Sequence, residues 1–368
     1  MNILITGADG FVGRNLKEFL KQERPGDTIF SYDIDSPPDS LSEYCKKADF
    51  VFHLAGVNRP KDDSEFITGN IGLTETALSY CKEGKKPPVL LSSSVQASLD
   101  NPYGKSKKAG EDAALAYEQE TGSPAYVFRL PGIFGKWCRP DYNSVVATFC
   151  HNIANGLPIE VRDAAYELKL IYIDDVCRAF LDALCGRFEK DGDYCKAGPV
   201  YSITLGDLAD TLRSFRMSRR DLHIPDMSDA FTRKLHSTYQ SYLPDFSYSL
   251  SERTDERGSF TEFFRTADRG QTSVNVTKPG VTKGNHWHHT KTEKFFVVSG
   301  EGIVRFRKVG ENDIKEYPVS CGDHKMIDIP PGYVHSIENT GAADLVTIMW
   351  ANELFDPQKP DTFPDIVV

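Results

Sequence analysis

The first half of the chain alternates short, wholly apolar runs with longer stretches in which apolar residues recur every three or four positions. Residues 3–5 and 89–91 are continuous apolar runs, which is typical of strands buried on both faces of a parallel sheet. Residues 12–21 have the spacing of a helix with one apolar face. The same two patterns predict strands at 28–32 and 49–54, and helices from residue 70, at 145–155 and at 176–184. The alternation predicts an α/β fold of Rossmann type, built around a doubly wound parallel sheet.

The pattern changes at about residue 244, where helical spacing gives way to short strands separated by glycine and proline turns. The clearest of these strands are residues 272–276, 294–298, 303–307 and 346–350. Closely spaced strands of this kind are typical of an antiparallel β-barrel or jelly roll. We therefore expect two domains, residues 1–243 and 244–368. A length of 368 residues agrees with this division, because a single core rarely grows beyond about 250–300 residues.

Composition narrows the class of protein. The formal net charge of −10 argues against nucleic acid as a partner. A strand that begins at residue 2 leaves no room for a signal peptide, and no apolar run approaches the roughly 20 residues that a membrane span needs. The eight cysteines are spread singly, which favours reduced thiols over a disulfide framework or a thiolate metal site. We expect a cytoplasmic protein without nucleic-acid or membrane partners.

Candidate chemistry begins at the N-terminus, where three glycines follow the first strand and open the first helix. Gly7 allows a tight turn, Gly10 allows backbone N–H groups to approach a pyrophosphate, and Gly13 allows the helix to pack close to its strand. The N-terminus of the helix adds partial positive charge. The stretch predicts a dinucleotide-binding βαβ unit, with the spacing GxxGxxG rather than GxGxxG.

The residues near these glycines leave the form of the cofactor open. Asp33 ends the second strand about 20 residues after the glycines, where an acid commonly binds the adenosine ribose hydroxyls of NAD. Arg14, directly after the third glycine, could instead reach the 2′-phosphate of NADP. A capping aspartate and a solvated arginine are the plainer interpretations, so NAD and NADP both stay open.

A tyrosine and a lysine four residues apart are the main candidates for catalytic residues in the first half. Tyr103 and Lys107 share one face of a helix. A neighbouring ammonium stabilises the phenolate form of a phenol that ordinarily titrates at about 10. Tyr103 is therefore a candidate general acid for a carbonyl under reduction. The segment follows a strand that ends in three serines, Ser92, Ser93 and Ser94.

These segments together resemble the extended short-chain dehydrogenase/reductases, the nucleotide-sugar epimerases, dehydratases and reductases. The matching segments are GADGFVG at 7–13, HLAG at 53–56, SSS at 92–94, YGKSK at 103–107, RLPGIFG at 129–135 and YIDD at 172–175. The resemblance implies that Ser94, Tyr103 and Lys107 form the catalytic triad, and Ser92 or Ser93 could replace Ser94. It implies the cofactor-binding residues Gly7, Gly10, Phe11, Val12, Gly13, Arg14, Asp33, Leu54, Ala55, Gly56, Tyr103 and Lys107.

Two features depart from the family pattern. The distance between the serines and Tyr103 is short, and the stretch between Asp33 and Asp49 is too brief for a full βαβ unit. We therefore expect a trimmed adenine pocket and substrate lid. Asn58 and Arg59, which follow the HLAG turn, are candidates for substrate contacts, and a solvated loop explains them equally well.

The second half contains four residues of metal-ligand type. His286 and His288 alternate on one strand and so point to the same face, whereas Glu293 lies on the next strand and His335 on a later hairpin. Three imidazoles and one carboxylate suit zinc, nickel, iron or manganese, and availability favours zinc. The glycines and prolines that frame these residues resemble both motifs of the cupins. One cupin branch, the sugar-nucleotide epimerases, often lacks metal and uses the first histidine as a base, so His286 is either ligand or catalytic base.

A reductase half followed by a cupin half resembles the two-domain enzymes of capsular polysaccharide synthesis over the whole chain. The resemblance implies a bifunctional, homodimeric enzyme of UDP-N-acetyl-L-fucosamine assembly. The cupin would epimerise C3 of a UDP-2-acetamido-2,6-dideoxy-hexos-4-ulose, and the N-terminal half would then reduce the C4 ketone with NADPH to UDP-2-acetamido-2,6-dideoxy-L-talose. The alternative is an NAD-dependent nucleotide-sugar epimerase or dehydratase whose cupin only binds sugar or dimerises.

Overall fold

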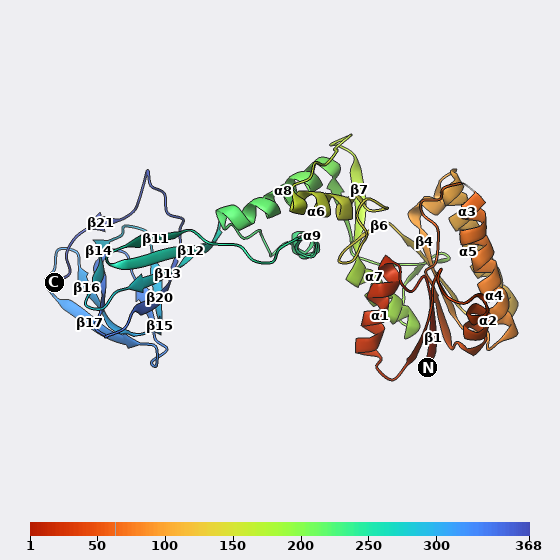
Figure 1. Ribbon diagram of the computed structural model, residues 1–368, viewed down its shortest axis with the longest axis horizontal. Helices are drawn as coiled ribbons and strands as arrows, with labels where there is room; N and C mark the ends of the chain where they lie inside the picture. Colours follow the sequence, from red (N-terminus) through yellow and green to blue (C-terminus); the bar gives the residue numbers. More distant parts are fainter. Residues whose placement is uncertain (63) are drawn as a thin grey trace. The chain divides into compact units, whose positions relative to one another are not determined.

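The computed structural model describes residues 1–62 and 64–368, which form two compact units. The first unit comprises residues 1–213 and 233–244, and the second comprises residues 214–232 and 245–368. The predicted fold class is confirmed, because a Rossmann-type α/β fold is followed by an all-β jelly roll, whose strands begin at residue 252 (Figure 1). The functional boundary between residues 243 and 244 stays a prediction.

Within the described residues, a seven-stranded sheet forms the centre of the first unit. Its strand order is β2-β1-β3-β4-β5-β9-β8, with parallel pairing from β2 to β9 and an antiparallel β8 at the edge. Both faces are apolar, since Ile3 and Ile5 enter one core cluster and Leu4 the other. The strands are β1 (Asn2–Thr6), β2 (Thr28–Tyr32), β3 (Phe50–His53), β4 (Val89–Ser94), β5 (Ala125–Leu130), β8 (Lys190–Asp191) and β9 (Tyr194–Cys195).

Helices cover both faces of this sheet (Figure 1). On one face Leu16 of α1 and Phe180 of α7 join the core, and on the other face Leu41 of α2 and Tyr117 of α5 do so. The three-layer arrangement brings the carboxyl ends of the parallel strands to one edge, where such folds bind ligands. The helices are α1 (Phe11–Glu23) and α7 (Ile173–Leu184) on the first face, and α2 (Pro38–Lys47), α4 (Leu73–Glu83) and α5 (Pro102–Thr121) on the second.

Two connections differ from the regular family pattern. The brief stretch between Asp33 and Asp49 contains one helix, α2, and β3 returns to pair with β1 on the side away from β2. The helix predicted to begin at Asn70 begins earlier, because α3 (Ser64–Phe66) leads into a π-helical turn, η1 (Ile67–Gly72), before α4. This wider turn coincides with the buried side chain of Asn70, and such turns frequently occur at functional sites.

The remaining elements of this part of the chain form a small sheet of order β10-β7-β6 and several helices. The predicted helix at 145–155 is confirmed as α6. The elements are η2 (Val95–Ser98), β6 (Gly132–Phe134), α6 (Val145–Asn155), β7 (Glu167–Tyr172), β10 (Val200–Thr204), α8 (Leu205–Asp221) and α9 (Ala230–Gln240).

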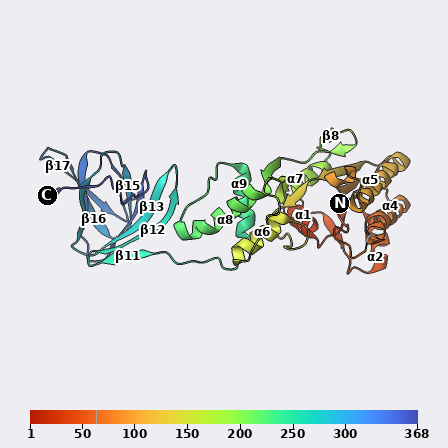
Figure 2. The ribbon, with the colours of Figure 1, turned by 90° about the horizontal axis from the view of Figure 1, so that it is seen from above.

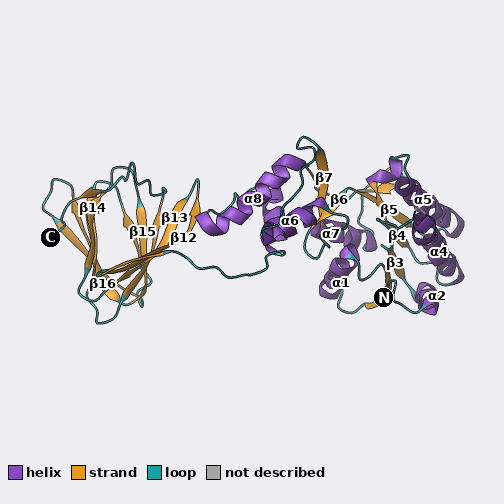
Figure 3. Cartoon of the chain, turned by 45° about the horizontal axis from the view of Figure 1, so that its top comes forward, coloured by secondary structure: helices purple, strands orange, loops and turns teal. Residues whose placement is uncertain are grey.

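Two antiparallel sheets form most of the second unit (Figures 2 and 3). Their orders are β11-β12-β13-β20-β15-β18 and β17-β16-β19-β14-β21, and Phe295, Val304 and Ile337 belong to the shared core. The strands are β11 (Glu252–Asp255), β12 (Gly258–Thr266), β13 (Gly270–Thr277), β14 (Thr282–Trp287), β15 (Glu293–Ser299), β16 (Glu301–Lys308), β17 (Ile314–Ser320), β18 (Met326–Ile329), β19 (Tyr333–Asn339), β20 (Leu345–Ala351) and β21 (Phe363–Pro364).

The structure also bears on the cysteines and on membrane-spanning helices. The eight cysteines are free thiols and most are buried, as expected of small apolar side chains. Across residues 1–62 and 64–368, every helix is too short or too polar to cross a membrane.

The glycine turn packs closely against the start of α1. A Cβ on Gly13 would lie 2.2 Å from the Gly7 carbonyl oxygen and 2.8 Å from the Ala8 Cα. We expect Gly13→Ala to destabilise the first unit by about 1–3 kcal/mol through overpacking, measured by thermal or urea unfolding. Gly26→Ala is the control, because a Cβ there meets nothing within 4 Å. Equal unfolding midpoints for the two variants would contradict the close packing.

Candidate functional sites

The glycine turn lies at the carboxyl ends of β1, β2 and β3. The Gly7 amide donates to the Tyr32 carbonyl at 2.9 Å, and Gly7 has a φ of +70°. A Cβ on Gly7 would lie 2.7 Å from the Ala55 nitrogen, so the turn touches the chain directly after β3. Helix α1 begins after Gly10 without a side-chain cap, which leaves its first amides suited to a phosphate. The other predicted cofactor residues at the start of α1 and after β3 are Phe11, Val12, Gly13, Leu54 and Gly56.

Asp33 and Arg14 relate differently to this turn. The Asp33 carboxylate accepts hydrogen bonds from the Asp9 amide at 2.7 Å and from the Ile34 amide at 2.8 Å. Asp33 is thereby held at the glycine turn, where an adenosine ribose would lie. Arg14 is an exposed residue of α1. The structure therefore brings Asp33 to the turn and leaves the Arg14 side chain in solvent.

The three serines at the end of β4 separate by strand alternation. The Ser93 hydroxyl donates to the buried Glu111 carboxylate at 2.6 Å, and Arg129 holds the same carboxylate with two bonds of 2.6 and 2.9 Å. Ser92 and Ser94 lie on the opposite face of the strand from Ser93. Ser93 therefore has a structural partner that faces away from Tyr103.

Ser94 is the serine that reaches the phenol of Tyr103. Burial raises the pKa of Tyr103, and a hydrogen bond with Ser94 lowers it by a smaller amount. The phenol also donates to Oδ1 of Asn58 at 2.9 Å, and its ring packs against Phe66 with centroids 5.7 Å apart. The predicted pair of Ser94 and Tyr103 is thus brought together, with Asn58 as a further neighbour.

Lys107 lies one turn along α5 from the phenol. Its Nζ is 6.0 Å from the centroid of the Tyr103 ring and donates to the Ser92 carbonyl at 3.3 Å. Burial lowers the pKa of Lys107 to about 8, against an opposing effect of Glu111. A Cβ on Gly56 would lie 3.1 Å from this Nζ, so Lys107 also meets the turn after β3. The amine links the serine-containing end of β4 to the expected cofactor site.

Asn70 is a neighbour of this site that no sequence motif indicated. Its buried side chain accepts from the Val57 amide at 2.7 Å and donates to the Val57 carbonyl at 3.1 Å and the Ser106 hydroxyl at 2.9 Å. It therefore ties the loop after β3 to α5, close to Tyr103 and Lys107. The available signal was an asparagine next to two glycines in a helical pattern.

A polar, open cavity of about 550 Å³ also belongs to the first unit. Arg59 and Arg162 both line this cavity. Arg59 directly follows Asn58, which accepts a hydrogen bond from the Tyr103 phenol. Arg162 pairs with Glu160 at 3.0 Å. The full lining is Arg59, Asp141, Asn143, Ser144, Val145, Thr148, Glu160 and Arg162.

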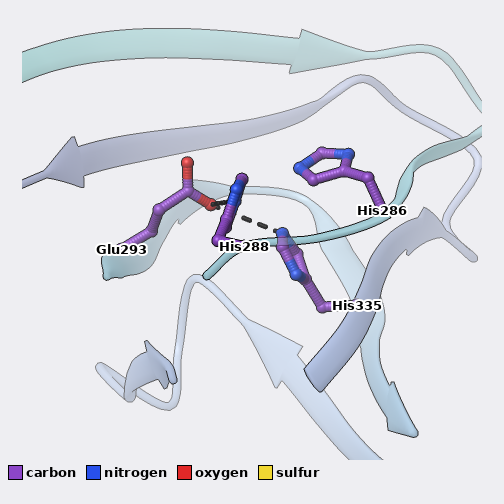
Figure 4. Close-up of side chains that lie close together, drawn as sticks. All are labelled: His286, His288, Glu293 and His335. Carbon is purple, nitrogen blue, oxygen red and sulfur yellow. Dashed lines mark ion pairs between the residues drawn. The ribbon is translucent and has the colours of Figure 1, made fainter. Parts of the chain in front are cut away.

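In the second unit, the four predicted metal-ligand residues converge (Figure 4). His286 on β14, His288 directly after it and His335 on β19 come from the five-stranded sheet, whereas Glu293 begins β15 in the other sheet. One potential ligand atom from each lies within 4.8 Å of all the others. The side chains of His288 and His335 are each 1% exposed, so these two rings are buried inside the jelly roll, whereas His286 and Glu293 are partly exposed.

The donor atoms of this group fit a metal ion. Oε2 of Glu293 lies 3.6 Å from Nε2 of His288 and 3.4 Å from Nε2 of His335. A tetrahedral zinc ion with ligands at about 2.0–2.2 Å separates N and O ligands by about 3.4 Å. Both Nε2 atoms are buried without a hydrogen-bond partner, which is costly unless something else binds them. His286, His288, Glu293 and His335 could therefore hold zinc.

Electrostatics in this group agree with a ligand set ready to bind a cation. Burial, followed by repulsion from the other two imidazoles, lowers the pKa of His286 to about 4. Burial raises the pKa of the Glu293 carboxyl, but the imidazoles of His288 and His335 lower it by more, so it lies below its ordinary value. Neutral imidazoles and an ionised carboxylate are the forms that bind metal.

Comparison with known proteins gives matches over both units. Residues 3–194 match the NAD dependent epimerase/dehydratase family, and residues 253–363 match the polysaccharide biosynthesis C-terminal domain. A UDP-2-acetamido-2,6-beta-L-arabino-hexul-4-ose reductase of Pseudomonas aeruginosa is 43% identical over 99% of this chain and 98% of its own.

Solved structures also include a match over the whole chain. The capsular polysaccharide assembling protein CapF from Staphylococcus aureus is 49% identical, with a TM-score of 0.94 over 100% of both chains. The UDP-glucuronic acid 4-epimerase of Bacillus cereus, with 19% identity and a TM-score of 0.55 over 66% of this chain and 98% of its own, shares the fold alone. The chain belongs to the NAD dependent epimerase/dehydratase family and, over its whole length, to the family of CapF.

Proposed function

We propose that this chain is a bifunctional UDP-sugar enzyme, in which residues 1–243 reduce a C4 ketone and residues 244–368 epimerise C3. The observation that supports this most is that the predicted side chains lie together in each unit, Ser94, Tyr103 and Lys107 in one and His286, His288, Glu293 and His335 in the other. The 43% identical relative is named as a 4-ketosugar reductase. The proposed substrate is a UDP-2-acetamido-2,6-dideoxy-hexos-4-ulose and the product UDP-2-acetamido-2,6-dideoxy-L-talose.

The reduction needs a proton donor at the ketone oxygen. The Tyr103 phenol supplies that proton. Ser94, which forms a hydrogen bond with the phenol, orients the ketone oxygen toward it. The Lys107 ammonium stabilises the phenolate that remains, because a positive charge nearby favours the anionic form. When bound, the reduced nicotinamide supplies the hydride that adds to C4.

The proposed cofactor is NADPH, as the family resemblance implies, with NADH as the second possibility. The uncapped N-terminus of α1 suits the pyrophosphate of either form. Arg14 is exposed on α1 and suits a 2′-phosphate, whereas Asp33 at the glycine turn suits ribose hydroxyls. The choice between NADPH and NADH therefore depends on these two residues.

The epimerisation uses the acidity of C3. A C4 ketone acidifies the C3 proton, because the resulting anion spreads onto the carbonyl oxygen. Zinc held by the four residues would supply positive charge for that oxygen. His286 is proposed foremost as the fourth ligand, since its ring centroid lies only 4.5 Å from that of His335 and 5.0 Å from that of His288. As the alternative, His286 is the base that removes the proton.

Arg59 and Arg162 are proposed to bind the diphosphate of the substrate. Both line the polar cavity of about 550 Å³ in the first unit, and guanidinium groups bind phosphate oxygens in a bidentate manner. Arg59 is next to Asn58, whose side chain contacts the Tyr103 phenol.

The proposal also includes a homodimer and a cytoplasmic location. Analytical sedimentation would test the homodimer.

The reductase assignment predicts a strong effect of one oxygen atom. Tyr103→Phe should lower NADPH-dependent reduction of the 4-ketosugar by about 10²–10⁴-fold while cofactor still binds. Ser94→Ala should also slow reduction, whereas Ser93→Ala should act on stability through Glu111. Absorbance of NADPH and unfolding midpoints measure these effects. Near-normal reduction by Tyr103→Phe would contradict the role of Tyr103, and a parent that never consumes NADPH would favour the NAD-dependent alternative.

The metal assignment predicts loss of zinc from one variant. Purified protein should contain about one zinc per chain, and Glu293→Ala should lose most of it, because the carboxylate balances the charge of the ion. Glu301→Ala, an exposed acid on β16, is the control. His286→Gln should lose zinc as well; retained zinc with lost C3 exchange would assign His286 as the base. Metal-free parent protein with an unchanged melting temperature after zinc addition would contradict the site.

The order of the two reactions predicts isotope exchange without reduction. Full-length protein given the 4-ketosugar in D₂O without NADPH should place deuterium at C3, as NMR would show. Tyr103→Phe should still exchange and Glu293→Ala should not. Exchange that survives in Glu293→Ala and disappears in Tyr103→Phe would mean that epimerisation belongs to the first unit instead.

A further inference from the structure

We propose that Asp361 is a positioning residue for the zinc ligand His288, and that the segment 361–367 fixes the strand that presents both His286 and His288. The proposal rests on the metal role assigned above. Asp361 contacts the backbone after β14 with its carboxylate and the His288 ring with its carbonyl. One residue, 73 positions away in sequence, thus meets both the loop and the ligand.

The carboxylate organises the loop that joins β14 to β15. It accepts hydrogen bonds from three successive amides, those of His289 at 2.9 Å, Thr290 at 2.8 Å and Lys291 at 2.8 Å, and from the Thr290 hydroxyl at 3.1 Å. Hydrogen bonds to a charged group are about twice as strong as neutral ones. This loop begins after His288 and ends before Glu293, so its shape sets the separation of two proposed ligands.

The carbonyl of Asp361 orients the imidazole itself. Nδ1 of His288 makes a short hydrogen bond to this carbonyl. A carbonyl can only accept, so Nδ1 carries a proton, and in the neutral ring the lone pair is on Nε2, which faces Glu293. Metal-bound histidines almost always have such an outer partner on the second nitrogen. His335 has the weaker equivalent, with Nδ1 3.4 Å from the Tyr333 carbonyl.

The residues after Asp361 fix the side-chain alternation of β14 so that His286 and His288 point inward. The pairing of β14 with β19 shifts register between Gly284 and His286, and Asn285 there has a φ of +58°. The Asp365 amide donates to the Asn285 carbonyl at 3.1 Å and the Val367 amide to Oδ1 of Asn285 at 3.2 Å. The segment therefore binds the irregular residue on which the inward direction of His286 and His288 depends.

Two further contacts fasten this segment to the jelly roll. Strand β21 pairs with His286 and Trp287, and the Phe363 ring lies 5.0 Å from that of Trp287. Arg307 binds the Asp365 carboxylate at 2.9 Å and the Ile366 carbonyl at 2.7 Å. Substitution of Asp361 removes its carboxylate and leaves its carbonyl, so it tests whether the bonds of the carboxylate to the loop keep that carbonyl against the His288 ring.

Metal affinity in the full-length chain tests the proposal. The variants are Asp361→Ala, Asp361→Asn and, as matched control, Asp356→Asn, an exposed acid that accepts from the Gln358 amide nearby. Zinc dissociation constants come from competition with a chelating dye, and visible spectra of cobalt-loaded protein report coordination geometry. We expect Asp361→Ala to bind zinc about 10–100-fold more weakly with an altered cobalt spectrum at saturation, Asp361→Asn to lie between, and the control to match the parent.

Each other outcome counts against a defined part of the proposal. A folded Asp361→Ala protein with the parent's zinc affinity and cobalt spectrum overturns the positioning role, even if its metal-free melting temperature falls, because that drop alone indicates a structural role. If Asp361→Ala does not fold, Asp361→Asn decides by the same two readouts. A parent that binds neither zinc nor cobalt overturns the metal assignment and this inference together, while NADPH-dependent reduction still tests the first unit separately.

Discussion

Both candidate sites depend on which face of a strand each side chain takes. In β4, alternation sends the Ser93 hydroxyl to Glu111 and leaves Ser94 to Tyr103, so a slip of one residue would give the phenol a different partner. In β14, the irregular residue Asn285 resets the phase, so that His286 and His288 point inward to Glu293 and His335. The ladder of backbone hydrogen bonds thereby fixes chemistry as well as fold.

Features that depend on neighbouring residues were predictable from the sequence. Strand periods, helix spacing and the glycine turn are set locally, and the structure contains the expected elements within a few residues. The group of His286, His288, Glu293 and His335 was also predictable, because metal ligands need specific residue types in a recognisable frame.

Features that depend on partners distant in sequence, and that no motif marks, were not predictable. The choice among the three serines depends on Glu111, which is 18 residues from Ser93 and lies on another element. Asn70 and Asp361 act through backbone partners on other segments, and the local sequence does not show which partners these are. Such residues become visible only when the fold brings their partners to them.

Burial disfavours the charged form in both centres, and different partners oppose it. At Lys107, burial lowers the pKa of the amine, and the buried Glu111 one turn away raises it by a smaller amount, so that the pKa is about 8. At Glu293, neighbouring imidazoles keep the carboxylate ionised despite burial. Lys107 is thus balanced by a protein carboxylate, whereas the buried Nε2 atoms of His288 and His335 lack a hydrogen-bond partner among the described residues. This difference is the physical reason to propose a cation in the second centre.

Under the proposed function, the two reactions constrain each other through chemistry alone. The C3 proton is acidic only while C4 is a ketone, so every reduction removes a molecule from the pool that can still be epimerised. Reduction before epimerisation would fix the wrong configuration at C3 and could not be corrected by the jelly-roll unit. The configuration of the product therefore depends on the ratio of the epimerisation rate to the reduction rate, and on which C3 epimer the reductase centre accepts. An enzyme with both centres on one chain contains them in a one-to-one ratio at every expression level, so changes in the amount of enzyme do not alter the balance between them.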